Sequence, residues 1–114
     1  ARRDSALLSV AYQTINTLEN TGALAWSKET GLLSIWLLGM FNPSAGVTMV
    51  IPFIEGPVQS LGPIVNDEYF GKVPAERLKV GNGVIFFRGD GQYRSKIGLS
   101  PQRATDVMGR PEWL

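Results

Sequence analysis

Aromatic side chains that accompany carboxylates and basic residues are the feature of this sequence best suited to chemistry. Protein sites for sugars combine an apolar or aromatic wall with a few polar groups that fix the orientation of the ligand. The aromatic candidates are Trp26, Trp36, Tyr69, Phe70 and Tyr93. We expect six residues to converge on one concave ligand-binding surface: Trp26, Glu29, Asp67, Tyr69, Arg94 and Lys96. In the plainer alternative, Trp36 and Phe70 belong to the core and the charged residues to the surface.

Catalytic chemistry has few candidates. The chain contains no His and no Cys, which excludes a Ser-His-Asp triad, a thiolate nucleophile and a zinc site with Cys ligands. Asp67 and Glu68 are adjacent, so on a strand they would point to opposite faces instead of flanking one glycosidic bond. The Gly-rich segments 81–83 and 89–91 do not open a helix, as a phosphate-binding loop would. We predict no catalytic residue, no metal site and no cofactor.

The tripeptide Arg88-Gly89-Asp90 matches the adhesion sequence that integrins bind. Three residues match by chance very often, and turn geometry already explains the two glycines that flank Asp90. Adhesion is therefore a minor alternative.

Composition limits the class of protein. The 114 residues suit one domain over residues 1–114, and the hydrophobic content of 44% argues against disorder. The net charge of +1 argues against a nucleic-acid binder with a broad basic surface. The most apolar run, residues 32–41, is about half as long as a membrane-spanning helix, so we expect no membrane partner. No targeting signal is recognisable, which leaves the localisation open.

Gly and Pro recur at the spacing typical of an all-β domain. We predict strands at residues 8–19, 32–41 and 46–54. The near-continuous apolar character of residues 32–41 suggests a strand covered on both faces, with a helix as the alternative. Pro52 suggests an edge position or a bulge in the third strand. Residues 55–74 are predicted to form a loop, and Ser100 followed by Pro101 predicts a short helix over residues 101–108.

Residues 78–99 give the clearest local signal, a three-stranded meander. Asn82-Gly83 and Asp90-Gly91 are both preferred pairs for two-residue hairpin turns. The first turn predicts that Val80 faces Ile85. The second predicts that Phe87 faces Arg94 and Ile85 faces Lys96, so both cations would share a face with apolar neighbours. A bulge at either turn would exchange the faces of the last strand.

Five sequence blocks carry a resemblance to a known family: NTG at residues 20–22, ETGLLSIW at 29–36, GMFNP at 39–43, GPIVNDEYFGKVP at 62–74 and DGQYRSKIGL at 90–99. Together they resemble an uncharacterised bacterial family related to galactose mutarotases and other sugar-binding supersandwich proteins. The resemblance covers roughly residues 8–109. It implies that this chain is an internal segment of a supersandwich.

The resemblance carries over no catalytic residue. Mutarotases use a His as general acid and a Glu late in the chain as base, and this sequence has no His and lacks the region of that Glu. We therefore expect an all-β, antiparallel β-sandwich or barrel-like sheet with one short C-terminal helix. The expected function is a non-catalytic binding or interaction module with carbohydrate-binding ancestry. The alternative is a sugar epimerase-like or lyase-like enzyme that works without His. The expected partners are a second copy of the chain, as a homodimer, and a carbohydrate; a compact monomeric barrel is the alternative to the dimer.

Overall fold

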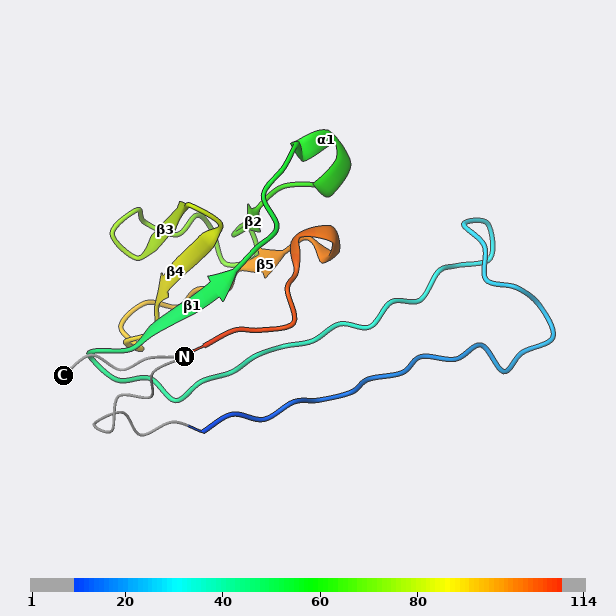
Figure 1. Ribbon diagram of the computed structural model, residues 1–114, viewed down its shortest axis with the longest axis horizontal. Helices are drawn as coiled ribbons and strands as arrows, with labels where there is room; N and C mark the ends of the chain where they lie inside the picture. Colours follow the sequence, from blue (N-terminus) through cyan, green and yellow to red (C-terminus); the bar gives the residue numbers. More distant parts are fainter. Residues whose placement is uncertain (1–9, 110–114) are drawn as a thin grey trace. The chain divides into compact units, whose positions relative to one another are not determined.

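The computed structural model describes residues 10–109, which divide into two units: one extends to Gly39 and the other begins at Met40. The secondary structure is mostly antiparallel strand with little helix, so the all-β, antiparallel prediction is confirmed at that level. Figure 1 shows the elements, which are β1 (Thr48–Pro52), α1 (Val58–Leu61), β2 (Val65–Asn66), β3 (Leu78–Gly81), β4 (Val84–Arg88), β5 (Gly98–Leu99) and the short 3-10 helix η1 (Pro101–Arg103).

The first unit holds no helix and no strand within residues 10–39, where the chain runs as extended backbone (Figure 1). The predicted strand at 8–19 is therefore wrong over its described part, while residues 8 and 9 lie outside the described residues. The predicted strand at 32–41 is also wrong. The segment is not covered on both faces as expected, because the side chains of Leu33 and Leu37 are 65% and 66% exposed. A strand needs a lateral partner for its backbone groups, and no ladder within residues 10–109 pairs with either segment.

The second unit is built on a three-stranded sheet with the order β1-β4-β3. The strand predicted at 46–54 is confirmed as β1, which occupies one end of the sheet. Pro52 lies in this end strand, opposite Val84, as its missing N–H requires. On the other side of β1, two isolated bridges join Val50 to Gly109 and Phe53 to Ala104. The sheet stays open and does not close into a barrel.

The hairpin between β3 and β4 is confirmed with its predicted register, in which Val80 faces Ile85 and Gly81 faces Val84. Asn82 and Gly83 both have left-handed backbone, with φ of 51° and 70°. Positive φ at both central residues defines a type I′ turn, whose twist matches that of the flanking strands. The Asn-Gly pair is sufficient for this turn because Gly has no Cβ and Asn tolerates positive φ better than most residues.

The third strand of the predicted meander is wrong. Arg88 faces Thr48 and Phe87 faces Met49, so β1 occupies the edge of β4 that was assigned to residues 93–97. After Asp90 the chain leaves the sheet, and β5 pairs with β2 in a separate two-stranded sheet. Arg94 and Lys96 consequently do not lie on the apolar face that the predicted register gave them.

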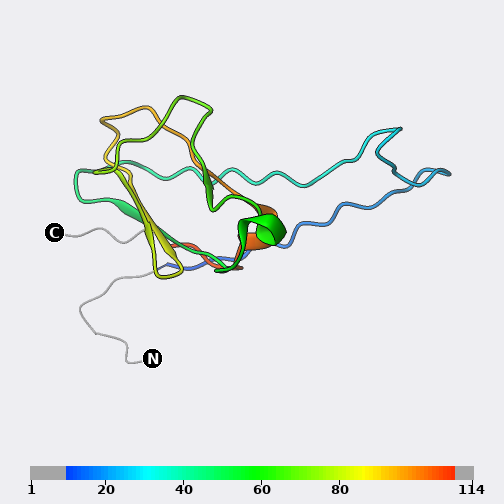
Figure 2. The ribbon, with the colours of Figure 1, turned by 90° about the horizontal axis from the view of Figure 1, so that it is seen from above.

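The predicted helix at 101–108 is also wrong beyond its first turn, since only η1 (Pro101–Arg103) forms. The Ser100 hydroxyl donates to the carbonyl of Pro63 at 2.7 Å instead of capping the helix. The backbone after η1 is used in the bridges of Ala104 and Gly109 to the β1 region, which competes with helix formation. The helix α1, which lies in the predicted loop 55–74, contacts η1, and both views show the two side by side (Figures 1 and 2).

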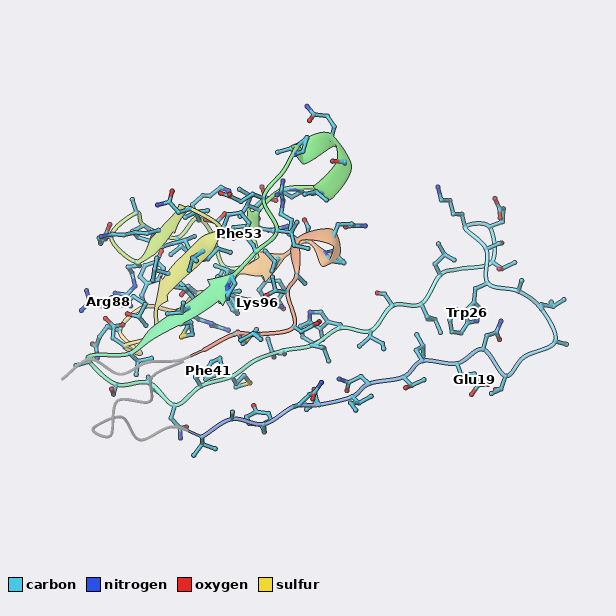
Figure 3. The ribbon with its side chains drawn as sticks, viewed as in Figure 1. Glu19, Trp26, Phe41, Phe53, Arg88 and Lys96 are labelled. Carbon is cyan, nitrogen blue, oxygen red and sulfur yellow. The ribbon has the colours of Figure 1, made fainter. Side chains whose placement is uncertain are left out.

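The core lies against one face of the three-stranded sheet. Its buried apolar residues are Val47, Phe53, Val73, Ile85 and Phe87. Ile85 and Phe87 alternate with the exposed Phe86 and Arg88 along β4, the period-two pattern of a strand with one covered face. Figure 3 labels Phe53 and Arg88 in this unit. The loops that carry the candidate sites are attached to this sheet.

Candidate functional site

The pairing of β2 with β5 brings together the two segments that hold most of the predicted site residues. Asn66 faces Gly98 and Val65 faces Leu99 in this ladder. As a result, the Lys96 ammonium lies over the Tyr69 ring, with Nζ 4.0 Å from the ring centroid. A cation at this distance is attracted by the negative face of the ring. Tyr69 and Lys96, predicted to share a site, are therefore neighbours.

A second aromatic ring and a second cation extend this surface. The rings of Tyr69 and Phe70 form an edge-to-face pair with centroids 4.7 Å apart and an interplanar angle of 88°. The Arg94 guanidinium carbon lies 4.4 Å from the Phe70 centroid. Each of the two aromatic rings is therefore in contact with one basic side chain, Tyr69 with Lys96 and Phe70 with Arg94. The sequence prediction that places Arg94 and Lys96 in one site with Tyr69 is consistent with this arrangement, although the register behind it is wrong.

An open pocket of about 360 Å³ lies beside Tyr69, and its lining residues are Pro63, Asn66, Tyr69, Lys96, Gly98, Leu99 and Ser100. This volume is at the small end of the range of ligand sites in proteins. Tyr69 is 71% exposed, so much of its side chain remains accessible. The Asn66 side-chain oxygen accepts a hydrogen bond from the Glu68 N–H at 3.0 Å, and its amide nitrogen donates none among the described residues. We call Asn66, Tyr69 and Lys96 with this pocket the Tyr69 surface.

The side chain of Asp67 forms hydrogen bonds within the loop that contains Tyr69. One of its oxygens accepts from Lys72 Nζ at 2.7 Å and the other from the Val73 N–H at 3.0 Å. The bond from Lys72, followed by that from Val73, lowers the pKa of Asp67 below its ordinary value, and the same ion pair raises the pKa of Lys72. Asp67 is only 7% exposed. Both oxygens are engaged, so the structure gives this predicted ligand-binding residue a local positioning contact.

Trp26 and Glu29 belong to the first unit, at the loop closed by the Gly31 N–H and the Ser27 carbonyl at 2.9 Å (Trp26 is labelled in Figure 3). A hydrogen bond from the Ser27 side chain is the main cause that lowers the pKa of Glu29. Trp26 precedes this loop directly and Glu29 lies within it. The other four predicted residues lie in the second unit, and the single surface of six remains a prediction.

Sequence reasoning missed an ion-pair network around Asp90. This carboxylate accepts hydrogen bonds from Arg77 Nη2 and from the Gln92 N–H at 2.9 Å, and it forms an ion pair with Arg88, whose Nε lies 2.7 Å from Oδ2. Together they lower its pKa to about 2, with the Arg77 bond as the largest cause and the Gln92 bond next. Asp90 is 8% exposed. The carboxylate of the Arg88-Gly89-Asp90 tripeptide is therefore bound within the chain and is not presented for adhesion.

A second missed feature is Arg103, which is fully buried in η1. Its guanidinium donates to the carbonyls of Gly62, Ile54 and Gly56 at 2.8, 2.9 and 3.0 Å. No carboxylate pairs with it among residues 10–109. A buried Arg has no sequence signature of its own, because its partners are backbone carbonyls that any residue could supply.

Within residues 10–109, no group of three or more acidic, His or Cys side chains is placed to hold a metal ion. The same residues contain no helix with the length and hydrophobicity needed to cross a membrane.

Comparison with known proteins gives one family. No curated protein and no solved structure matches the chain. A family described as "Family of unknown function (DUF6786)" matches residues 2–112, which is nearly the whole sequence. The chain therefore belongs to this family.

Proposed function

We propose that this protein is a non-catalytic binding module that binds carbohydrate at the Tyr69 surface. The observation that carries the proposal is the position of the Lys96 ammonium, 4.0 Å from the Tyr69 centroid, at the wall of the 360 Å³ pocket. An exposed aromatic ring beside hydrogen-bond donors suits a ligand with apolar ring faces and polar edges. Asn66 supplies a further amide donor at the same pocket.

The family-like sequence blocks support the same proposal. Residues 62–74 and 90–99 are two of the blocks on which we base the resemblance to a family related to sugar-binding supersandwich proteins, and they meet in the β2–β5 pairing. We propose in addition that the open sheet of the second unit is part of a β-sandwich of that kind. One face of the sheet already covers a core, and sandwiches are built by packing such faces together.

Substitution of Tyr69 tests the carbohydrate proposal. We expect Tyr69→Ala to weaken the binding of glucose or galactose, titrated by calorimetry, about fivefold, because loss of an aromatic contact costs about 1 kcal/mol. Tyr12→Ala is the matched control, since Tyr12 is also exposed but lies in the other unit. Equal affinities for Tyr69→Ala and the unsubstituted chain, or no detectable binding of either sugar at millimolar concentration, would contradict the proposal.

We also propose that the chain forms a homodimer. The exposed Leu33 and Leu37 support this, because a partner chain could bury their apolar side chains. The outer edge of β3 supports it as well, since β3 ends the sheet and has no further strand partner among the described residues. Unpaired strand edges readily accept another strand.

Light scattering tests the dimer. We expect about 25 kDa for the unsubstituted chain, twice the 12.5 kDa of one copy, and about 12.5 kDa for Leu37→Glu, because a buried unpaired charge is costly. Gln59→Glu, on the exposed face of α1, adds the same charge elsewhere and should leave the mass unchanged. A mass near that of one chain at micromolar concentration for the unsubstituted protein would exclude the dimer.

A further inference from the structure

The face of the three-stranded sheet opposite the core carries basic side chains around an exposed aromatic ring. The register places Thr48 and Arg88 in one row across the strands, and Val50, Phe86 and Lys79 in the next. Arg77 extends the first row, because its carbonyl accepts from the Arg88 N–H at 2.8 Å. Alternate residues of a strand share a face, so these side chains lie on the side away from the buried Ile85 and Phe87.

This face contains a pocket of about 420 Å³ whose lining includes Thr48, Glu76, Arg77, Lys79, Phe86 and Arg88. We call it the Phe86 pocket. It shares no lining residue with the pocket of the Tyr69 surface. Its volume lies within the range typical of small-molecule sites. Figure 3 labels Arg88, one of the residues that line this pocket.

The charges of the Phe86 pocket leave one positive charge without compensation. Arg77, Lys79 and Arg88 supply three positive charges, and Glu76 in the lining and Asp90, which pairs with Arg77 and Arg88, supply two negative ones. Arg88 pairs with Asp90 through Nε, 2.7 Å from Oδ2, yet its side chain is 50% exposed and so accessible to a ligand. The side chain of Lys79 has no hydrogen bond or ion pair in the described part of the chain.

We propose that the Phe86 pocket binds a monoanion in which a carboxylate is attached to a ring, the class to which uronic acids belong. The half-exposed guanidinium of Arg88 can bind both oxygens of a carboxylate, and Lys79 adds a second positive charge to the same pocket. Phe86 is 46% exposed and offers a flat apolar surface for the ring.

Three other groups narrow the ligand class. Thr48 can exchange hydrogen bonds with ring hydroxyls, and Glu76 can accept one. The single uncompensated charge favours a monoanion over a dianion such as phosphate, because Glu76 repels a second negative charge. Asp90 holds Arg77 and Arg88 in place, so their side chains are ordered before a ligand arrives. This inference concerns a separate pocket and does not depend on the Tyr69 surface.

Calorimetric titration of the full chain with sodium glucuronate at low ionic strength tests the proposal. We expect millimolar or tighter binding, at least tenfold weaker binding of glucose, which has a similar ring and no charge, and weak binding of sulfate, which has no ring. Lys79→Gln should weaken glucuronate binding about tenfold. Lys28→Gln removes the same charge from an exposed position in the first unit and should change the affinity less than twofold.

Four outcomes would overturn the proposal. The first is no glucuronate binding by the unsubstituted chain, and the second is equal affinity for glucuronate and glucose. The third is an equal loss of glucuronate affinity in Lys79→Gln and Lys28→Gln, which would mean that binding depends only on the net charge of the chain. Sulfate binding as tight as glucuronate binding would overturn the assignment to a ring-bearing acid. Tyr12→Ala, an exposed position in the first unit, should leave glucuronate affinity unchanged.

Discussion

Replacement of Arg103 by methionine is expected to lower the free energy of unfolding by about 3–5 kcal/mol. The side chain is fully buried and donates three hydrogen bonds to the backbone of residues 54–62. Hydrogen bonds to charged groups contribute about 1.5–3 kcal/mol each, and their sum is reduced because one side chain makes all three. Methionine has a similar length but cannot donate, so three carbonyls would lose their partner.

Urea denaturation followed by circular dichroism measures this loss. Arg103→Lys keeps the charge on a compact ammonium that cannot reproduce the planar fork, and it should give an intermediate loss. Gln102→Met, an exposed neighbour in η1, should shift the unfolding free energy by less than about 0.5 kcal/mol. Amide exchange should accelerate at Ile54, whose N–H donates to the Arg103 carbonyl at 2.9 Å. An Arg103→Met chain that unfolds at the same urea concentration as the unsubstituted chain would refute the structural role.

Asp90→Asn is expected to give the second large effect, a loss of stability that depends on pH. The pKa of Asp90 is lowered to about 2 from 3.8 in the folded chain, so ionised Asp90 stabilises the fold above pH 3.8. That contribution is lost as the pH falls from about 4 to about 2, where the folded form also takes up the proton. Asparagine is neutral at every pH and cannot balance Arg77 and Arg88.

The urea midpoint, measured from pH 7 down to pH 2, tests this prediction. The midpoint of Asp90→Asn should lie well below that of the unsubstituted chain at pH 7, and the two should approach each other below pH 4. Asp106→Asn makes the same charge change at an exposed residue with no ion pair among the described residues, so it should show little difference at either pH. A constant gap for Asp90→Asn across the range would show that the ion pairs do not supply its stability.

Several features of the second unit could be predicted from short-range signals. Asn82-Gly83 predicts the turn and, with it, the pairing of Val80 with Ile85, because two-residue loops fix the register of the strands they join. Pro52 predicts an edge strand because it lacks an N–H for a ladder. The predicted grouping of Tyr69, Arg94 and Lys96 rests on the family-like sequence blocks and on a register of the third meander strand that is wrong.

Other features required information that no local window holds. Asp90-Gly91 has the same turn signal as Asn82-Gly83, yet β1 occupies the edge of β4 that the second hairpin would use. The competition between a near and a distant strand for one edge depends on packing of the whole sheet. Ser100-Pro101 starts a helix that ends after one turn, because the backbone at Ala104 and Gly109 pairs with the β1 region instead.

Residue types and short-range spacing are enough to exclude His and Cys chemistry and to predict the antiparallel strands, the first hairpin and the types of residue available for binding. Only the tertiary structure decided which of those residues meet: Lys96 over Tyr69, Arg77 and Arg88 on Asp90, and Arg103 on the 54–62 backbone. The physical reason is the range of the interactions. A turn depends on the backbone angles of adjacent residues, whereas a buried Arg finds acceptors 41 to 49 positions away, and that encounter depends on how the whole chain packs.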